Sequence, residues 1–299
     1  MGNADLVGSR CPRAPLRRAV PFSALVLSWL LLLACEADRA NLSAAPITKS
    51  NAATANASPG VEGELRVYAA ASLTDAFTEI GRDFEAQNPG AHVVFNFGPS
   101  SGLRTQIENG AAADVFASAD DVQMASAVKS GIVAGEPQPF ARNSLAVVLP
   151  ADNPGKIDSL HDLGRPGVRL VATNPQVPVG AYTLQVLDKL SRDPTYGPEF
   201  SKNAVANIRS HEEDVRSLLA KVTLGEADAG VVYTSDITPQ VASQVKVIAI
   251  PPADNVTATY PIAVVQGSHR PDVAQRFVES VLSDDGQKTL ARWGLQPVQ

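Results

Sequence analysis

Hydroxyl and small residues recur in this sequence where a β-rich run gives way to a helical pattern. Ser72 stands at the first of these junctions, and Ser100 and Ser101 stand at the second. A third junction, Pro178–Gly180, has no side-chain donor but opens a helix with free backbone N–H groups, and Tyr233 closes a later strand. Helix N-termini and hydroxyl groups donate hydrogen bonds to anions. The pattern therefore predicts a site for a small anion.

These junctions carry no cluster of Arg, Lys or His. A dianion leaves water only where donors replace its hydration shell, and peptide and hydroxyl groups do this without a counter-charge. A site built from donors alone disfavours a protonated anion, because the O–H of that anion requires an acceptor. We therefore expect the ligand to be a fully deprotonated oxyanion.

Two junction residues have simpler interpretations when each is taken alone. Ser72 and Asp75 have the spacing of a helix capping box. At a fourth junction, Val215 is typical of a core position, and its neighbours Asp214 and Arg216 are expected to form a solvated pair. Residue type alone therefore assigns neither Ser72 nor Val215 to a ligand.

Short β-rich runs alternate with helical patterns from Glu64 onward. This alternation predicts α/β layers with mostly parallel sheets, in which ligands bind beyond the carboxyl ends of the strands. The predicted strands are Leu65–Ala70, His92–Phe97, Asp114–Ala117, Leu145–Leu149, Val168–Ala172, Ala229–Tyr233, Val245–Ile250 and Ile262–Val265. The predicted helices are Leu73–Gln87, Gly180–Leu190, Glu212–Leu224 and Pro271–Leu282.

The first part of the chain is predicted to lie outside the fold. Residues 1–34 hold several Arg followed by an apolar run, and Cys35 comes next; this pattern resembles an export signal with a lipoprotein cleavage site. We expect residues 1–34 to be removed, Cys35 to carry the lipid, and residues 35–63 to form a flexible tether. The protein would then be exported and anchored to the outer face of the cell membrane.

Composition argues against several classes of protein. The 299 residues are 44% hydrophobic and 19% charged, which is typical of a globular chain and not of a disordered one. A formal net charge of -6 argues against a nucleic-acid partner, which would favour a basic surface. The 4 His and 2 Cys are scattered, so we expect no metal site made of protein ligands.

Six sequence blocks, taken in order, resemble the molybdate-binding periplasmic proteins that supply molybdate ABC importers. The resemblance runs from about Glu64 to the C-terminus. The blocks are Tyr68–Thr74, Ala113–Asp120, Asn143–Val148, Glu213–Arg216, Gly230–Asp236 and Tyr260–Val265. It implies high-affinity extracytoplasmic binding of molybdate or tungstate, no cofactor and no catalysis. It also implies a permease and its ATPase as partners, and we expect a monomer.

The same resemblance implies the type II periplasmic-binding-protein fold, with two α/β lobes and a hinge of two strands. Lobe I would comprise residues 64–142 and 262–299, and lobe II would comprise residues 143–261. The chain would cross between the lobes near Asn143 and again near Tyr260. The anion would bind in the cleft between the lobes.

Carried over position by position, the resemblance implies five ligand-binding residues. Ser72 and Ser100 would supply hydroxyl and backbone donors from lobe I. Val179 and Val215 would supply backbone N–H groups from lobe II, and Tyr233 would supply its phenol.

Two positions depart from the family pattern. Val179 stands where Ala is common, which would narrow the pocket without removing the backbone donor. Pro99 interrupts a stretch that is usually richer in Ser, so Ser101 is an additional candidate beside Ser100.

Three other functions are compatible with parts of the sequence. Gly98–Gly102 fits the pattern G-x-S-x-G, so Ser100 could be the nucleophile of a serine hydrolase with His211 or His269 as its base. The oxyanion could instead be sulfate, or the chain could be a lipid-anchored adhesin without a ligand. Hydrolysis of simple esters would favour the enzyme, and stabilisation by an anion would favour a binding protein.

Overall fold

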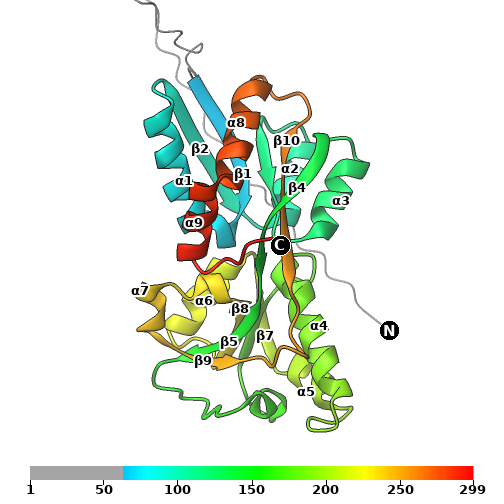
Figure 1. Cartoon of the computed structure of the whole chain (residues 1–299). Helices are drawn as coiled ribbons and strands as arrows, with labels where there is room; N and C mark the ends of the chain where they lie inside the picture. The colour runs from blue at the N-terminus through cyan, green and yellow to red at the C-terminus, as the bar shows by residue number, and fades with distance from the viewer. Residues whose placement is uncertain (1–62, 299) are drawn as a thin grey trace, which may run out of the picture. The chain divides into compact units, whose positions relative to one another are not determined.

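The computed structural model describes residues 63–298, which form two five-stranded sheets flanked by helices (Figure 1). Sheet A has the strand order β2-β1-β3-β10-β4, and sheet B has the order β7-β6-β8-β5-β9. The strands of sheet A are β1 Gly63–Ala70, β2 Ala91–Gly98, β3 Val115–Ala117, β4 Val133–Asn143 and β10 Ala258–Val265. The strands of sheet B are β5 Leu145–Pro150, β6 Leu170–Thr173, β7 Ile208–Glu212, β8 Ala229–Tyr233 and β9 Val245–Ala249.

Each sheet is mixed, with one strand opposed to its neighbours. In sheet A, β1 is parallel to β2 and β3, whereas β10 is antiparallel to β3 and β4. In sheet B, β6 is parallel to β7 and β8, whereas β5 is antiparallel to β8 and β9. The chain enters sheet B from sheet A at β5 and returns to sheet A at β10, so in each sheet the antiparallel strand is the one at which the chain arrives from the other sheet. Every residue of β5 is buried, as expected of a strand covered on both faces.

The helices bury apolar faces against these sheets. Phe77, Ile80 and Phe84 lie at helical spacing on α1 and are all buried. The ring of Phe277 on α8 lies 6.1 Å from that of Phe77 and 5.4 Å from that of Phe84, centroid to centroid. The α-helices are α1 Thr74–Gln87, α2 Ser100–Glu108, α3 Asp121–Lys129, α4 Pro178–Arg192, α5 Phe200–Ala206, α6 Val215–Thr223, α7 Pro239–Ala242, α8 Pro271–Leu282 and α9 Asp284–Arg292.

The eight predicted strands and four predicted helices are present, with ends shifted by a few residues. The sequence does not reveal β4 or β7, and both are edge strands. Pro137 and Pro139 in β4 are tolerated because an edge strand has one side without a partner. No residue of β7 is fully buried, so this strand lacks an apolar signal. The helix expected from Glu212 begins at Val215, because Glu212 is the last residue of β7.

The chain passes between the two sheets twice. β4 ends at Asn143 and β5 begins at Leu145, so a single residue separates strands of different sheets. The return connection runs from β9 to β10. Beside the first crossing, Arg142 N donates to Gln296 O at 2.8 Å and Gln296 N donates to Arg142 O at 2.9 Å. These bonds hold the C-terminal segment against β4. The predicted lobes, residues 64–142 with 262–299 and residues 143–261, stay a prediction.

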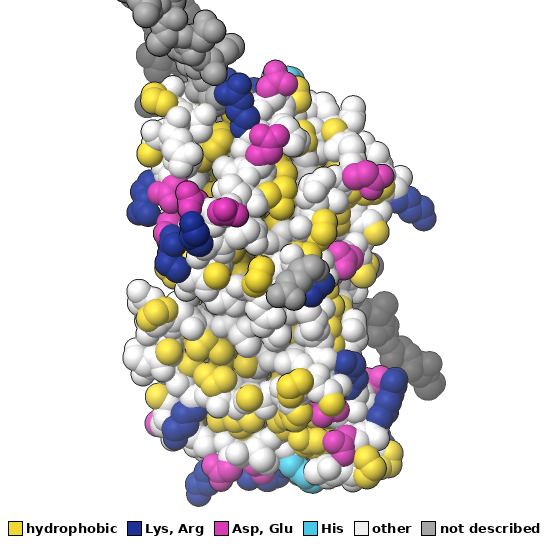
Figure 2. All heavy atoms as spheres, viewed as in Figure 1, with side chains coloured by type: hydrophobic (Ala, Val, Ile, Leu, Met, Phe, Trp, Pro, Cys, Tyr) yellow, Lys and Arg dark blue, Asp and Glu magenta, His cyan; other side chains and the backbone are white. Residues whose placement is uncertain are grey.

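Charged side chains of both signs are interspersed over α1 and α9 on the face that Figure 2 shows. The Arg292 guanidinium lies 2.5 Å from the Glu79 carboxylate, and Trp293 Nε1 donates to the same carboxylate at 2.7 Å. The hydrogen bond from Arg292 holds the pKa of Glu79 below its usual value. These contacts fix α9 on α1, immediately before the C-terminal segment.

The predicted signal peptide, the lipid-bearing Cys35 and the tether lie outside the described residues. Within residues 63–298, no helix combines the length and the apolarity needed to cross a bilayer.

Candidate functional site

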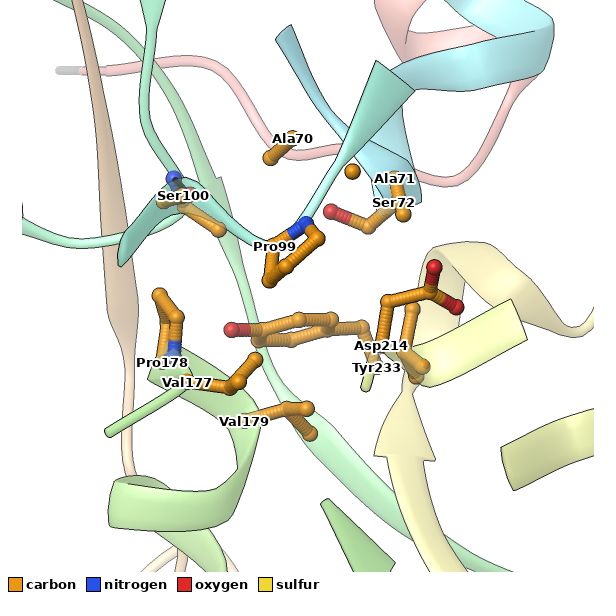
Figure 3. A pocket seen from close by; sticks show the side chains of 13 residues that line it. Ala70, Ala71, Ser72, Pro99, Ser100, Val177, Pro178, Val179, Asp214 and Tyr233 are labelled. Carbon is orange, nitrogen blue, oxygen red and sulfur yellow. Dashed lines mark hydrogen bonds between the residues drawn. The ribbon is translucent and has the colours of Figure 1, made fainter. Parts of the chain in front are cut away.

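A small cavity lies where segments that follow strands of both sheets come together (Figure 3). Its volume is about 20 Å³, counted as the space open to the centres of water molecules. A single water requires roughly 10–15 Å³ of such space, so the cavity suits a compact ligand. Its lining residues are Ala70, Ala71, Ser72, Gly98, Pro99, Ser100, Ala119, Val177, Pro178, Val179, Asp214, Val215 and Tyr233. The structure thus brings together Ser72, Ser100, Val179, Val215 and Tyr233, whereas Ser101 is not among the lining residues.

Three helices begin at this cavity. Ser100 is the first residue of α2, Val179 is the second residue of α4, and Val215 is the first residue of α6. Backbone N–H groups in a first turn have no carbonyl partner within their own helix, and the helix dipole adds partial positive charge there. Peptide donors from three helices therefore surround one small volume.

Ser100 is held in place by the backbone of a neighbouring segment. Ala119 N donates to Ser100 Oγ at 3.0 Å, and the Ser100 side chain is buried. A hydroxyl oxygen that accepts from an N–H group keeps its own proton for another acceptor. Because Ser100 lines the cavity, its proton is available to an anion inside it.

Ser72 has a different role from the helix cap that its spacing with Asp75 predicts. Leu73 is the N-cap of α1 and has no side-chain cap bond, so the capping-box prediction is wrong. Ser72 Oγ instead lies 3.0 Å from the hydroxyl of Tyr260, a residue of β10. The partner is 188 positions away in the sequence, so local spacing could not identify it.

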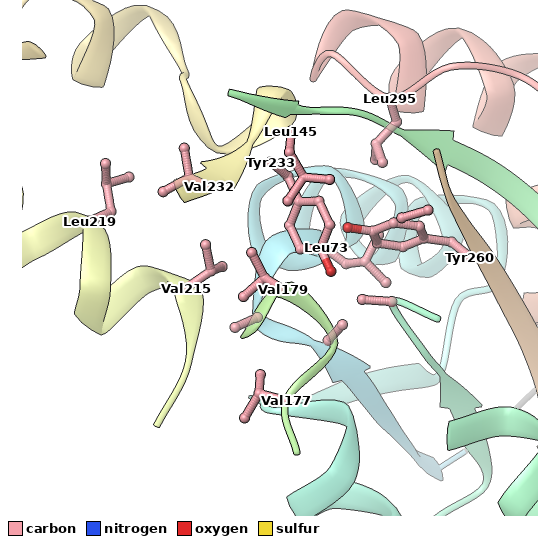
Figure 4. Packing of buried hydrophobic residues seen from close by; sticks show 14 of the residues in the cluster. Leu73, Leu145, Val177, Val179, Val215, Leu219, Val232, Tyr233, Tyr260 and Leu295 are labelled. Atoms are coloured by element: carbon pink, nitrogen blue, oxygen red, sulfur yellow. The ribbon is translucent and has the colours of Figure 1, made fainter. Parts of the chain in front are cut away.

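Tyr233 lines the cavity, and its buried hydroxyl is unpaired within the part of the chain that the structure describes. The residue ends β8, is 1% exposed, and its hydroxyl has no hydrogen-bond partner among the described residues. Its ring packs at 5.7 Å from that of Tyr260, centroid to centroid (Figure 4). Burial raises the pKa of the Tyr233 phenol well above its usual value, so the hydroxyl remains a donor. An unpaired buried donor is costly, and a bound acceptor would remove that cost.

Asp214 and Arg216 do not form the solvated pair expected from the sequence. Asp214 Oδ1 accepts from Ser217 N at 2.9 Å and so caps α6. The Arg216 guanidinium pairs with the Asp75 carboxylate on α1, and Arg216 Nε donates to Ala71 O at 3.3 Å. Arg216 is not a lining residue of the cavity, but it joins the start of α6 to the segment that carries Ser72.

A buried carboxyl group beside Tyr233 does not emerge from the sequence analysis. Asp236 Oδ2 accepts from Tyr233 N at 3.0 Å, whereas Oδ1 has no partner among the described residues. Burial raises the pKa of Asp236 from 3.8 to about 7. The available signal was an acidic residue soon after a strand whose residues are all apolar or small.

The cavity does not bring a histidine to Ser100, as the serine-hydrolase alternative requires. No histidine is among its lining residues, so neither His211 nor His269 meets Ser100 there. Asp214 supplies the single carboxylate of the lining, and in Figure 3 this group points away from the Tyr233 hydroxyl. Within residues 63–298, no three His, Cys, Asp or Glu side chains gather in a group that could hold a metal ion.

Known proteins share this sequence pattern. A sequence model of the bacterial extracellular solute-binding proteins matches residues 65–296. The chain belongs to this family. The molybdate-binding protein ModA of Mycobacterium tuberculosis is 43% identical to this solute-binding protein over 228 residues, which cover 76% of this chain and 82% of that protein.

Solved structures share the fold of this solute-binding protein. The periplasmic molybdate-binding protein of Azotobacter vinelandii superposes with a TM-score of 0.67 at 24% identity, covering 79% of this chain and 100% of that one. The sulfate-binding protein SubI of M. tuberculosis superposes with a TM-score of 0.71 at 21% identity, covering 80% of this chain and 88% of that one. These likenesses confirm the predicted two-lobe periplasmic-binding-protein fold.

Proposed function

We propose that this solute-binding protein captures molybdate outside the cytoplasm and delivers it to an ABC-type importer. One observation carries the proposal: peptide N–H groups of three helix starts and three hydroxyl side chains line one small cavity that has no cationic side chain. The 43% identity to the molybdate-binding protein of M. tuberculosis supports molybdate as the oxyanion.

In this proposal, five residues bind the anion. Ser72, Ser100 and Tyr233 donate from their hydroxyls, and Val179 and Val215 donate from their backbone N–H groups. Neutral donors replace the water shell of a dianion, and the peptide N–H groups among them provide no acceptor for the O–H of a protonated anion. Tungstate has the same shape and charge as molybdate and should bind at the same site.

The proposal includes the cellular setting. The protein acts as a carrier rather than an enzyme, has no cofactor, and works as a monomer with a permease and its ATPase as partners. Residues 1–34 act as a signal peptide, and a lipid on Cys35 anchors the mature chain to the outer face of the membrane through the tether 35–63. Residues 64–142 with 262–299, and 143–261, are the two lobes that close around the anion.

Parallel titration with four oxyanions tests the function. Isothermal calorimetry and thermal unfolding are measured with molybdate, tungstate, sulfate and phosphate on the purified protein. We expect one site per chain, strong stabilisation by molybdate and tungstate, and weak or absent effects of phosphate at pH 7. Preferential binding of sulfate would assign the protein to sulfate instead, and no response to any of the four would refute the proposal.

A further inference from the structure

A buried hydrogen-bond network connects the first crossing between the sheets to Ser72. Asn143 is the last residue of β4, Tyr260 lies in β10, and both side chains are fully buried. The Tyr260 hydroxyl lies 3.0 Å from Ser72 Oγ and 3.2 Å from Asn143 Nδ2. One phenol therefore bridges an amide at the crossing and a hydroxyl that lines the cavity.

The partners of Asn143 fix the direction of its amide. Asn143 Oδ1 accepts from Ser144 N at 3.1 Å and from Thr234 Oγ1 at 3.0 Å. Ser144 N is a peptide nitrogen and can only donate, so the atom that faces it is the oxygen. Asn143 Nδ2 must then be the donor to Tyr260 and to Ser235 Oγ, which lies at 2.7 Å.

With Asn143 Nδ2 as a donor, the Tyr260 hydroxyl can act as the donor to Ser72. The Tyr260 hydroxyl accepts from Asn143 Nδ2, so its single proton is free to be donated to Ser72 Oγ. Ser72 Oγ then acts as an acceptor, and its own proton is left to point elsewhere. Ser72 lines the cavity, so this proton can reach a molecule bound there.

We infer that Tyr260 and Asn143 are positioning residues for the anion: they hold the Ser72 hydroxyl as a donor directed into the cavity. This inference rests on the proposed function. Neither residue lines the cavity, so both act through Ser72. Burial keeps the Tyr260 phenol protonated by raising its pKa well above the usual value, as the chain of donors requires.

The network also connects the two sheets. Ser72 follows β1 of sheet A, whereas Thr234 and Ser235 follow β8 of sheet B. Asn143 contacts Thr234 and Ser235 directly and reaches Ser72 through Tyr260. The Ser72 donor is therefore set by an arrangement that includes both sheets. A displacement of one sheet from the other that separated these partners would leave the Ser72 proton without a fixed direction.

A double-mutant cycle on anion affinity tests the inference. Calorimetry with molybdate is carried out on the wild type, Tyr260→Phe, Ser72→Ala and the double variant. Tyr260→Phe keeps the ring that packs at 6.2 Å from Phe140 and removes only the bridging oxygen. We expect Tyr260→Phe to weaken binding roughly three- to tenfold, Ser72→Ala roughly ten- to a hundredfold, and the double variant no more than Ser72→Ala alone.

Tyr196→Phe is the matched control. Tyr196 packs against Phe200, at 5.2 Å between ring centroids, and is not a lining residue of the cavity. The Tyr196→Phe variant should therefore bind molybdate with the affinity of the wild type. The binding stoichiometry reports the fraction of folded protein, so a loss of folding alone lowers the number of sites and leaves the dissociation constant unchanged.

The outcomes separate this inference from the proposed function. Wild-type protein that binds no molybdate refutes the proposed function. Wild-type binding together with unchanged affinity in Tyr260→Phe refutes only the positioning role. The positioning role is also refuted if the affinity of the double variant falls by the product of the two single losses, because Tyr260 would then act independently of Ser72.

Discussion

Arg216 of α6 forms an ion pair with Asp75 of α1, which connects a helix packed on sheet B to a helix packed on sheet A. The same arginine donates from Nε to Ala71 O, in the segment that carries Ser72. Val215, immediately before Arg216, begins α6 at the cavity. The pair therefore spans the region in which the anion is proposed to bind, without contributing a side chain to the cavity lining.

Arg216→Gln should accelerate anion release. The two side chains are 41% and 32% exposed, so the pair contributes at most about 1 kcal/mol, which corresponds to roughly a fivefold change in the dissociation rate constant. Stopped-flow measurement of molybdate release provides the test. Arg192→Gln, which breaks an exposed pair with Asp188 on α4, is the control and should release the anion at the wild-type rate. Equal rates in all three proteins would contradict a bridging role for Arg216.

Tyr233→Phe should separate binding from stability. The hydroxyl has no partner among the described residues, so its removal deprives the anion of a donor but breaks no bond within the described protein. Calorimetry should show molybdate binding weaker by roughly 1–3 kcal/mol. Thermal unfolding without ligand should show equal or greater stability than wild type. Unchanged affinity would remove Tyr233 from the site.

Ser100→Ala and Ser101→Ala distinguish two neighbouring hydroxyls. Ser100 Oγ accepts from Ala119 N and lines the cavity, so Ser100→Ala should weaken binding and also lower stability by about 1 kcal/mol through the unpaired N–H. Ser101 is not a lining residue, and its replacement should leave affinity near the wild-type value. Paired calorimetry and denaturant unfolding provide the comparison, and a larger loss of affinity in Ser101→Ala would reverse the assignment.

Asp236 should make the stability of the ligand-free protein depend on pH. Its pKa in the folded protein, about 7, lies above the ordinary value of 3.8, so the folded state binds a proton that the unfolded chain has already released between these values. The contribution of this group to stability therefore decreases as pH rises from about 4 to 7 and is constant above that range. The total change is at most about 4 kcal/mol.

Asp236→Asn keeps an acceptor for Tyr233 N and removes the ionisable group. Denaturant unfolding of both proteins at pH 5 and pH 8 should show a larger loss of stability in the wild type than in the variant. The same pH dependence in both would show that Asp236 does not titrate in this range.

The sequence predicted strands and helices well where burial produces a strong apolar period. β5 and β8 consist of buried residues, and α8 has its apolar residues on one face, so each stands out from its surroundings. β4 and β7 do not, because β4 contains Pro137 and Pro139 and no residue of β7 is fully buried.

The site was predictable only in part, because some of its groups have no signal in residue type. Ser72, Ser100 and Tyr233 carry donors that the sequence displays, whereas Val179 and Val215 contribute peptide groups that every residue possesses. Their valine side chains are buried in the core, so residue type indicates packing alone. The helix start at Pro178–Gly180 pointed to the backbone N–H groups near Val179, whereas for Val215 only the family resemblance did. The roles of Tyr260 and Arg216 depend on partners that folding brings close, over separations of up to 188 positions, and the raised pKa of Asp236 depends on its burial.

The C-terminal segment has a practical consequence for the study of this protein. Gln296 is bonded to Arg142, next to the single residue that separates β4 from β5. In the proposed carrier this segment lies beside the first crossing between the lobes, so we expect a bulky purification handle close to Gln296 to hinder lobe closure. A small fluorescent label on the same segment is expected to report the proposed closure around the anion as an optical signal.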